Sequence, residues 1–319
     1  KNPFGRKGDF ITAPNISRLF SEMVAIWTLS FWKSLGSPKK FNLIELGAGN
    51  GEMMRVMIET FKNFPPFLKC CNIIIIEKSP RLIKKQKINI NFGGIKWKKN
   101  LANLNSFPSI FLANEFFDAI PIKQFLKLKK FWYERFIKIS DDKNLTFVNK
   151  KTNIRTLEKK LKFKISKAQN FIEFSPLGNR YLNSIFKLIK KNKGGLLIID
   201  YGFFSEKMKN TLKAIYRKRH SEVLANLGKS DITYNINFNL IKKIAQNFGK
   251  LDINYTSQKN FLLNLGINQR AEIISKNKSF LQKADIFFRL KRLIDKRQMG
   301  QLFKVMLIKN SDNNFNIGF

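Results

Sequence analysis

Three glycines at alternate positions follow a short apolar segment that contains a carboxylate near its end. Residues 41–46 read Phe-Asn-Leu-Ile-Glu-Leu, with Glu45 near the end, and Gly47, Gly49 and Gly51 come soon after. An apolar run of this length predicts a buried strand, and the glycines predict a tight turn that leads into a helix. Because glycine has no Cβ atom, the turn can adopt positive φ and a ligand can lie against the main chain. The segment therefore predicts a binding loop for a flat or polar ligand.

Two classes of cofactor bind at such a loop, and the spacing of the glycines distinguishes them. The dinucleotide fingerprint is G-x-G-x-x-G, with a pyrophosphate at the N-terminus of the following helix. Here the pattern is Glu45-x-Gly47-x-Gly49-x-Gly51, so the third glycine comes one position early and an acid precedes the first. This is the loop of S-adenosylmethionine (SAM) enzymes, whose ligand has no phosphate and carries a cationic amino-acid end that favours a nearby carboxylate.

A second acid is expected at the end of the next strand, where it can accept both ribose hydroxyls of SAM. Residues 72–77 supply it, because four consecutive isoleucines predict a strand buried on both faces and Glu77 stands at its carboxyl end. A glycine-rich loop alone is a weak signal, whereas the loop together with a spaced acid is a stronger one. The alternative interpretation is a purely structural turn.

Three polar residues after a later apolar segment are candidates for catalysis. Asn114, Glu115 and Asp118 follow residues 109–113, and ligands of open α/β sheets bind beyond the carboxyl ends of the strands. Oxygen acceptors suit a nitrogen nucleophile, because they orient its N–H bonds and offset developing positive charge. For a guanidinium group, which is normally protonated, a carboxylate must also take the departing proton. The structural alternative is that the two acids cap a turn and a helix start.

Four further residues are weaker candidates for the substrate side of the site. Asp200 and Tyr201 stand at the end of the apolar segment 194–201, where Asp200 could equally be a hydrogen-bonding acid of the strand end. His220 is the one histidine of the chain and could act as a base, although lone histidines more often have structural roles. Asp231 could equally be a turn residue.

The elements that would position these residues alternate between strands and helices, which predicts an α/β fold with a doubly wound, mostly parallel sheet. Strands are predicted at 41–46, 72–77, 95–97, 109–113, 194–201, 251–257 and 302–308. Helices are predicted at 17–33, 52–63, 79–87, 177–191, 238–247, 259–264, 269–275 and 280–294.

The rhythm changes after residue 120. Segments 122–128 and 131–139 alternate apolar and polar residues with period two, and 145–148 could add a strand. We therefore predict a core of residues 1–120 and 170–319 with an inserted antiparallel subdomain at 121–169, which ends in a lysine-rich linker or helix from 150 to 168. Residues 203–235 lack a clear period and form a long excursion.

Composition sets limits on the class of protein. The chain has 319 residues, of which 44% are hydrophobic, and no apolar run approaches the roughly 20 residues that cross a bilayer. We expect a soluble protein without a membrane span. The two cysteines, Cys70 and Cys71, are adjacent, so we expect no disulfide and a cytosol-like compartment. With only one histidine in the chain, we expect neither a metal site nor a catalytic triad. The chain begins with Lys1 rather than Met, so the question of whether a segment with a targeting signal precedes it stays open.

The formal charge of +38 would normally indicate nucleic acid or an anionic membrane surface as a partner. The lysines, however, are spread along nearly every segment together with many Asn, Ile and Phe residues, as AT-rich codons produce. We therefore interpret the charge mainly as a consequence of genome composition rather than as a site for a polyanion.

Taken together and in this order, the motifs resemble those of the MidA family of SAM-dependent methyltransferases. This family includes the mitochondrial complex I assembly factor that methylates an arginine of a complex I subunit. The matching segments are 8–14, 45–51, 114–121, 199–202, 231–233 and 299–305.

The resemblance implies a class I, Rossmann-like methyltransferase core with an insertion and extra helices. It also implies SAM as cofactor, a protein arginine as substrate, and closure of residues 8–12 over the cofactor, with Gly8 and Thr12 in contact with it. Bacterial cytoplasm or mitochondrial matrix would be the location. The sequence departs from the family pattern at Ala48, where a proline is frequent, at Leu227-Gly228 in place of Pro-Gly, and at Asn235 in place of histidine.

Three other functions compete with this interpretation. An RNA methyltransferase is supported only by the charge. A non-catalytic assembly factor for a respiratory complex would keep the fold and bind its partner without SAM. A nicotinamide-dependent dehydrogenase is disfavoured by the glycine spacing.

Overall fold

The computed structural model describes residues 12–142, 144–217 and 219–319, and the chain divides into two compact units. Unit 1 comprises residues 1–116, 184–201 and 250–319, and unit 2 comprises 117–183 and 202–249. Unit 2 is larger than the predicted insertion at 121–169, because residues 117–120, 170–183 and 202–249 also belong to it.

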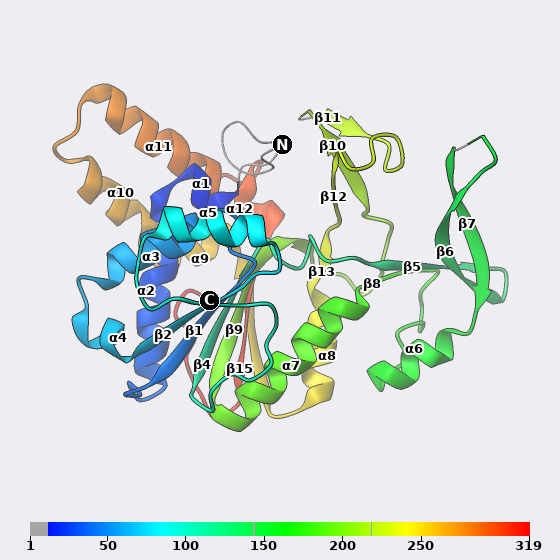
Figure 1. Ribbon diagram of the computed structural model, residues 1–319, viewed down its shortest axis with the longest axis horizontal. Helices are drawn as coiled ribbons and strands as arrows, with labels where there is room; N and C mark the ends of the chain where they lie inside the picture. The colour runs from blue at the N-terminus through cyan, green and yellow to red at the C-terminus, as the bar shows by residue number, and fades with distance from the viewer. Residues whose placement is uncertain (1–11, 143, 218) are drawn as a thin grey trace. The chain divides into compact units, whose positions relative to one another are not determined.

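A twisted, mostly parallel sheet forms the centre of unit 1 (Figure 1). Its main path runs β14-β15-β9-β4-β1-β2-β3. Strands β1, β2, β3, β4 and β9 pair in parallel, whereas β15 is antiparallel to both β9 and β14. The strands are β1 (Phe41–Leu46), β2 (Cys71–Ile76), β3 (Lys96–Lys98), β4 (Ser109–Asn114), β9 (Gly194–Phe203), β14 (Leu251–Ser257) and β15 (Phe303–Asn310). The predicted doubly wound sheet is therefore confirmed.

Strand order places a topological switch point at β1. From β1 the chain builds the sheet outward in one direction through β2 and β3 and in the other through β4 and β9. In open α/β sheets ligands bind beyond the carboxyl ends of the strands at such a point. The segments that follow β1, β2 and β4 carry the glycine loop, Glu77 and Glu115, so the switch point is where the candidate residues meet.

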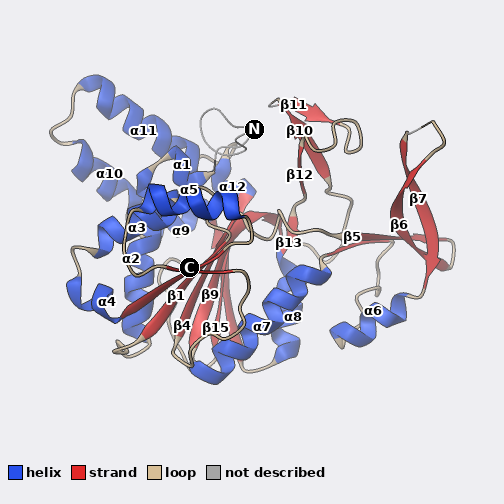
Figure 2. Ribbon diagram, in the orientation of Figure 1, coloured by secondary structure: helices blue, strands red, loops and turns tan. Residues whose placement is uncertain are grey.

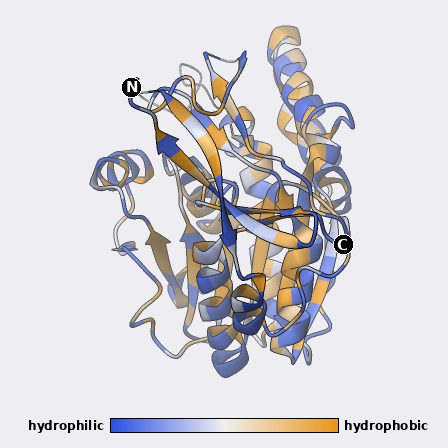
Figure 3. Ribbon diagram, turned by 90° about the vertical axis from the view of Figure 1, so that its right-hand side faces the viewer, coloured by the Kyte–Doolittle hydropathy of each residue, from blue (hydrophilic) through white to orange (hydrophobic). Residues whose placement is uncertain are grey.

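Helices pack on this sheet and complete the core of unit 1 (Figure 2). They are α1 (Ala13–Ile16), α2 (Arg18–Ser34), α3 (Glu52–Phe61), α4 (Pro65–Cys70), α5 (Pro80–Ile90), α9 (Gln258–Asn264), α10 (Ile267–Ser275), α11 (Phe280–Ile294) and α12 (Met299–Leu302). Helix α2 buries Phe20, Val24, Trp27 and Phe31, whose spacing places them on one face. Ser17 caps this helix by accepting the Leu19 N–H. In Figure 3 the strands of the sheet are mostly orange, that is, hydrophobic.

Unit 2 contains two antiparallel sheets. The first has the order β7-β6-β5-β8 and the second the order β11-β10-β12. The elements are β5 (Lys123–Leu128), β6 (Phe131–Ile139), β7 (Leu145–Thr152), α6 (Ile154–Leu161), β8 (Phe171–Phe174), β10 (Lys213–Tyr216), β11 (Arg219–Ser221), β12 (Asp231–Thr233), β13 (Ile236–Asn237) and α8 (Phe238–Phe248). Helix α7 (Pro176–Asn192) begins in unit 2 and ends in unit 1.

The predicted antiparallel strands are present, with two differences. Strand β7 continues to Thr152, where we predicted a linker or helix from residue 150. The excursion at 203–235 contains the second sheet, whose strands have only three or four residues and therefore show no period. None of the helices in the described part of the chain is long and apolar enough to cross a bilayer.

Candidate cofactor and catalytic site

The three loop glycines all adopt positive φ, at 65° for Gly47, 55° for Gly49 and 83° for Gly51. An added Cβ at Gly47 would lie 2.8 Å from Cδ2 of Phe116, and one at Gly51 would lie 3.0 Å from Cγ1 of Ile90. At Gly49, by contrast, no atom of the described residues lies within 4 Å of an added Cβ. Two glycines are therefore required by packing, whereas Gly49 leaves the main chain open to a ligand.

Glu45 is a buried carboxylic acid on β1, only 3% exposed. Burial, reinforced by the negative charge of Glu77, raises the pKa of Glu45 to about 8. Within the described parts of the chain, no hydrogen-bond donor reaches its Oε2 atom. A cationic group bound beside Glu45 would stabilise its carboxylate, so this position fits the ammonium group of SAM.

Glu77 lies directly after β2 in a fixed orientation. Its Oε1 accepts hydrogen bonds from the main-chain N–H groups of Lys78, at 2.8 Å, and Ser79, at 2.9 Å. Its Oε2 accepts one from Nε2 of Gln86 at 3.1 Å. An ionised carboxylate has about four acceptor positions, so Glu77 retains capacity for a ribose hydroxyl.

Gln86 is a residue of this site that the sequence did not single out. Its side chain on α5 is fully buried, and Nε2 also donates to the main-chain oxygen of Gly49 at 2.9 Å. Its Oε1 accepts a hydrogen bond from Nε1 of Trp97 at 3.0 Å. Gln86 thus joins the glycine loop to Glu77, and its only signal in the sequence was a polar residue among the apolar positions of a helix.

The start of the described chain is hydrogen-bonded to the loop. Asn15 donates to Oγ1 of Thr12 at 2.7 Å and accepts from Nδ2 of Asn50 at 2.8 Å. Thr12 therefore lies close to the loop, as its predicted role requires, through two asparagines that sequence reasoning missed. Gly8, which we also predicted to contact the cofactor, lies outside the described residues.

Asn114 is the last residue of β4, and Glu115 follows it with a left-handed backbone. Glu115 has a φ of +49°, a left-handed conformation that costs a residue with a Cβ about 1–2 kcal/mol. Its N–H group donates to the main-chain oxygen of Ile199 at 2.9 Å. Its Oε1 accepts from the N–H group of Ala13 at 3.3 Å and from Nδ2 of Asn114 at 3.4 Å. Strained backbone of this kind concentrates at functional sites.

Asp118 belongs to unit 2, where it is buried and accepts a hydrogen bond from Oγ1 of Thr233 at 3.1 Å. Burial raises the pKa of Asp118 to about 6, with the charge of Asp231 adding to the increase and the Thr233 hydrogen bond opposing it. An acid with this pKa can accept a proton near neutral pH. Its catalytic role stays a prediction.

The four substrate-side candidates fall into two pairs. Asp200 is fully buried, and its Oδ1 accepts a hydrogen bond from the main-chain N–H group of Tyr201 at 2.8 Å. This bond is the structural role that we considered for Asp200. His220 and Asp231 are exposed in unit 2, and both pair with Ile215 of β10 from opposite sides, which places them on one face of the small sheet. No role of these four residues in substrate binding is tested. Across the described residues, no cluster of His, Cys, Asp and Glu could hold a metal ion.

Comparisons with known proteins place the chain in a family. Residues 23–256 match the model of a protein family described as "Putative S-adenosyl-L-methionine-dependent methyltransferase". The mitochondrial protein arginine methyltransferase NDUFAF7 of Xenopus laevis is 29% identical, with 94% of this chain and 74% of that protein covered. The human protein of the same name is 26% identical, with 95% and 74% covered.

The fold also matches a solved structure. A protein from Burkholderia thailandensis, crystallised with S-adenosyl-homocysteine, superposes with a TM-score of 0.83 at 23% identity, with 99% of this chain and 84% of that chain covered. The family match extends over more than half of the chain and includes the glycine loop, Glu77 and Glu115. The chain therefore belongs to this family of SAM-dependent methyltransferases, the MidA family that its motifs predicted, and SAM is its cofactor.

Proposed function

We propose that the protein transfers a methyl group from SAM to an arginine nitrogen of a protein substrate. The observation that carries this proposal is the similarity to proteins named as arginine methyltransferases, which extends over 94% and 95% of the chain in the two relatives described above. A subunit of a respiratory complex I is the substrate that the family resemblance implies. The acceptor-rich end of β4 supports a nitrogen nucleophile, because it offers oxygen atoms to N–H groups.

The residues around the glycine loop would hold the cofactor. Glu45 would bind the ammonium group, the main chain at Gly49 would lie against the ligand, and Glu77 would accept a hydrogen bond from a ribose hydroxyl. When bound, SAM supplies an electrophilic methyl group on a sulfonium ion. Gln86 fixes the carboxylate of Glu77 relative to the loop by donating to both. Asn15, which bonds to Thr12 and to Asn50, holds the start of α1 close to the loop.

Glu115 and Asn114 would position the arginine side chain. A guanidinium group has a pKa above about 12 and donates through all its nitrogens, so it must lose a proton when one nitrogen is methylated. The carboxylate of Glu115 orients the N–H groups and accepts that proton. Asn114 contributes its Oδ1 atom, which accepts no hydrogen bond from the described residues.

The test of this function is mass spectrometry of methylated arginines in cells with and without the protein. We expect at least one methylated arginine peptide to disappear with the protein and to return with the wild-type gene but not with Glu115→Gln. Unchanged arginine methylation with a lost methyl group in RNA would favour an RNA methyltransferase. Unchanged methylation of both, with partner binding that persists without SAM, would favour an assembly factor.

Gln86→Leu is expected to weaken SAM binding about tenfold while kcat at saturating SAM stays within about twofold. The variant removes the donor shared by Gly49 and Glu77 and leaves the Trp97 N–H group buried without its acceptor. Calorimetric titration with SAM measures the first effect and initial rates measure the second.

Gln258→Leu is the matched control for Gln86→Leu. Gln258 is equally buried in unit 1 and donates to the main-chain oxygen of Leu293, but it does not contact the loop. An equal loss of SAM affinity in both variants, or no loss in Gln86→Leu, would contradict the positioning role of Gln86.

SAM binding is expected to release a proton near pH 7. The pKa of Glu45 is raised from 4.5 to about 8. At a pH between these two values, Glu45 is protonated in the free folded protein and ionised in the unfolded chain. The free energy of unfolding therefore decreases as the pH rises between these values. An ammonium group favours the carboxylate, so SAM affinity should increase from about pH 6 to about pH 8.

Calorimetry in buffers with different heats of ionisation measures this proton release. Glu45→Gln should abolish both the release and the pH dependence of the affinity. An apparent binding enthalpy at pH 7 that is the same in all buffers for the wild-type protein would contradict the linkage.

A further inference from the structure

Helix α11 is apolar on two sides. Its buried side packs in the core of unit 1 through Leu290 and Leu293. A second set of apolar residues, Phe280, Phe287 and Phe288, is exposed to solvent by 83%, 42% and 63%. A surface helix normally shows charged and polar residues on the side opposite the core. Packing of the core therefore does not account for these exposed apolar side chains.

The exposed residues form one continuous stripe. Phe280, Ala284, Phe287 and Phe288 are spaced as i, i+4, i+7 and i+8, which is the spacing of residues on one face of a helix. Leu281, 79% exposed, widens the stripe at the first turn. We refer to residues 280, 281, 284, 287 and 288 as the α11 stripe.

Basic side chains surround the α11 stripe. The exposed ones come from the turn between α10 and α11, from α11 itself and from the turn after it: Lys276, Lys278, Lys283, Lys291, Lys296 and Arg297. Three acids lie in the same region, Glu272, Asp285 and Asp295. Asp285 is paired with Arg289 at 2.7 Å, and Oδ1 of Asp295 accepts a hydrogen bond from the main-chain N–H group of Arg297 at 2.8 Å. The surroundings of the stripe are therefore positively charged.

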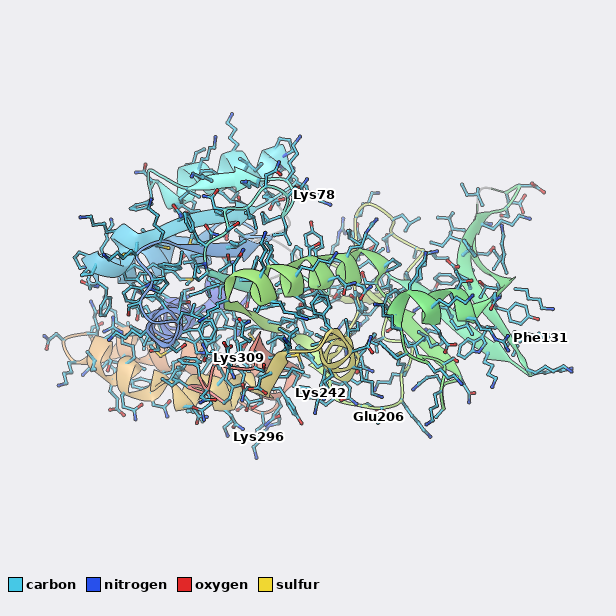
Figure 4. The ribbon with its side chains drawn as sticks, turned by 90° about the horizontal axis from the view of Figure 1, so that it is seen from below. Lys78, Phe131, Glu206, Lys242, Lys296 and Lys309 are labelled. Atoms are coloured by element: carbon cyan, nitrogen blue, oxygen red, sulfur yellow. The ribbon has the colours of Figure 1, made fainter. Side chains whose placement is uncertain are left out.

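A hollow of about 460 Å³ lies beside the stripe. Its apolar lining comes from Phe287, Leu290 and Ile294, and its charged lining comes from one acid and four basic residues: Asp295, Lys259, Lys291, Lys296 and Arg297. Figure 4 labels Lys296 at the outer edge of this part of unit 1. Apolar surface below a ring of cations suits a ligand with an anionic head and an apolar body.

We propose that the α11 stripe docks on the surface of an anionic lipid bilayer, with α11 lying in the plane of the interface. Phenylalanine and leucine side chains on one face with lysines around them are the features of helices that bind at membrane interfaces. Lipid headgroups of negative charge complement the six cations, and the hollow beside Phe287 accommodates one headgroup. The +38 charge of the chain adds long-range attraction to such a surface.

A second copy of the chain fits the stripe less well. A symmetric contact would bring the same lysines together from both copies, and like charges across an interface oppose association. The basic residues around the α11 stripe therefore favour a bilayer over self-association.

Flotation with phospholipid vesicles tests this proposal on the full chain. The wild-type protein should float with vesicles of phosphatidylcholine that contain about 30% phosphatidylglycerol, and not with pure phosphatidylcholine. Raising the salt from about 0.1 M to about 1 M should weaken the binding, because screening shortens the reach of the lysines.

Two sets of variants locate the surface. Phe280→Ser with Leu281→Ser and Phe288→Ser should reduce the bound fraction at least about tenfold. Ile88→Ser on α5, where Ile88 is 73% exposed, is the matched control and should bind as the wild type does. Lys283→Glu with Lys291→Glu should likewise lose binding about tenfold, whereas Lys33→Glu with Lys84→Glu should not.

Three results would overturn the proposal. The first is that the wild-type protein floats equally well with pure phosphatidylcholine vesicles. The second is that the triple serine variant floats as the wild type does, and the third is that the control variants lose as much binding as the stripe variants. Light scattering after size exclusion adds a fourth, since a dimer that the triple variant dissociates would assign the stripe to a second copy. Because the vesicle assay contains neither SAM nor substrate, its outcome is independent of the proposed methyl transfer.

Discussion

Glu115→Gln is expected to lower the rate of methyl transfer by about 10²–10⁴-fold, with SAM affinity within about twofold of the wild type. Glutamine keeps the length of the side chain and an oxygen for the Ala13 N–H group. It removes the negative charge that would orient the guanidinium and the basic atom that would accept its proton. Single-turnover assays of methylated product measure the rate, and calorimetry measures SAM binding.

Two further variants separate catalysis from folding. Glu59→Gln on α3 removes a partly exposed carboxylate of unit 1 and should leave the rate unchanged. Glu115→Gly should be as inactive as Glu115→Gln yet no less stable, because glycine adopts the φ of +49° without strain. Wild-type turnover in Glu115→Gln would remove this residue from the mechanism.

Gly49→Asp is expected to weaken SAM binding by at least about 100-fold. The new side chain would start at the one loop position where an added Cβ enters open space, and there it would occupy the volume that the ligand needs. Aspartate tolerates a φ of 55° better than most residues, so the fold should persist. Calorimetric titration measures the affinity, and circular dichroism checks the fold.

Gly36→Asp controls for the strain of such a substitution. Gly36 has a φ of +85°, and an added Cβ there also meets no atom of the described residues within 4 Å, but it lies between α2 and β1. It should bind SAM as the wild-type protein does. Unaltered affinity in Gly49→Asp would contradict the assignment of the loop.

Much of the fold was predictable because its signals are local. The run of isoleucines before Glu77 specifies a buried strand by composition alone, and the period of α2 specifies its buried face. The short strands β10, β11 and β12 could not be predicted, because three or four residues do not establish a period. The helix α4 was also missed, because its first two residues, Pro65 and Pro66, resemble a loop in sequence although proline suits a first helical turn.

The residues of the candidate site that could be predicted are those marked by their spacing from strand ends. Residues whose role comes from tertiary contacts could not be predicted. Glu45 lies near the carboxyl end of β1, and Gly49 and Glu77 follow the ends of β1 and β2 at fixed offsets, so the proximity of these residues follows from the sheet. Gln86 and Asn15 act through hydrogen bonds to residues distant in sequence, and nothing local marks a glutamine or an asparagine for such contacts. The left-handed backbone of Glu115 was equally hidden, because it is a property of the tertiary structure.

The short helix α1 bonds both to the glycine loop and to Glu115. Asn15 bonds to Asn50 of the glycine loop, and two residues earlier the N–H group of Ala13 bonds to Glu115. Under the proposed function, a shift of α1 on SAM binding would also move the carboxylate of Glu115 that binds the arginine. By thermodynamic reciprocity, arginine binding would then alter SAM affinity by the same factor. Such an arrangement would couple the release of the demethylated cofactor to the release of the methylated product.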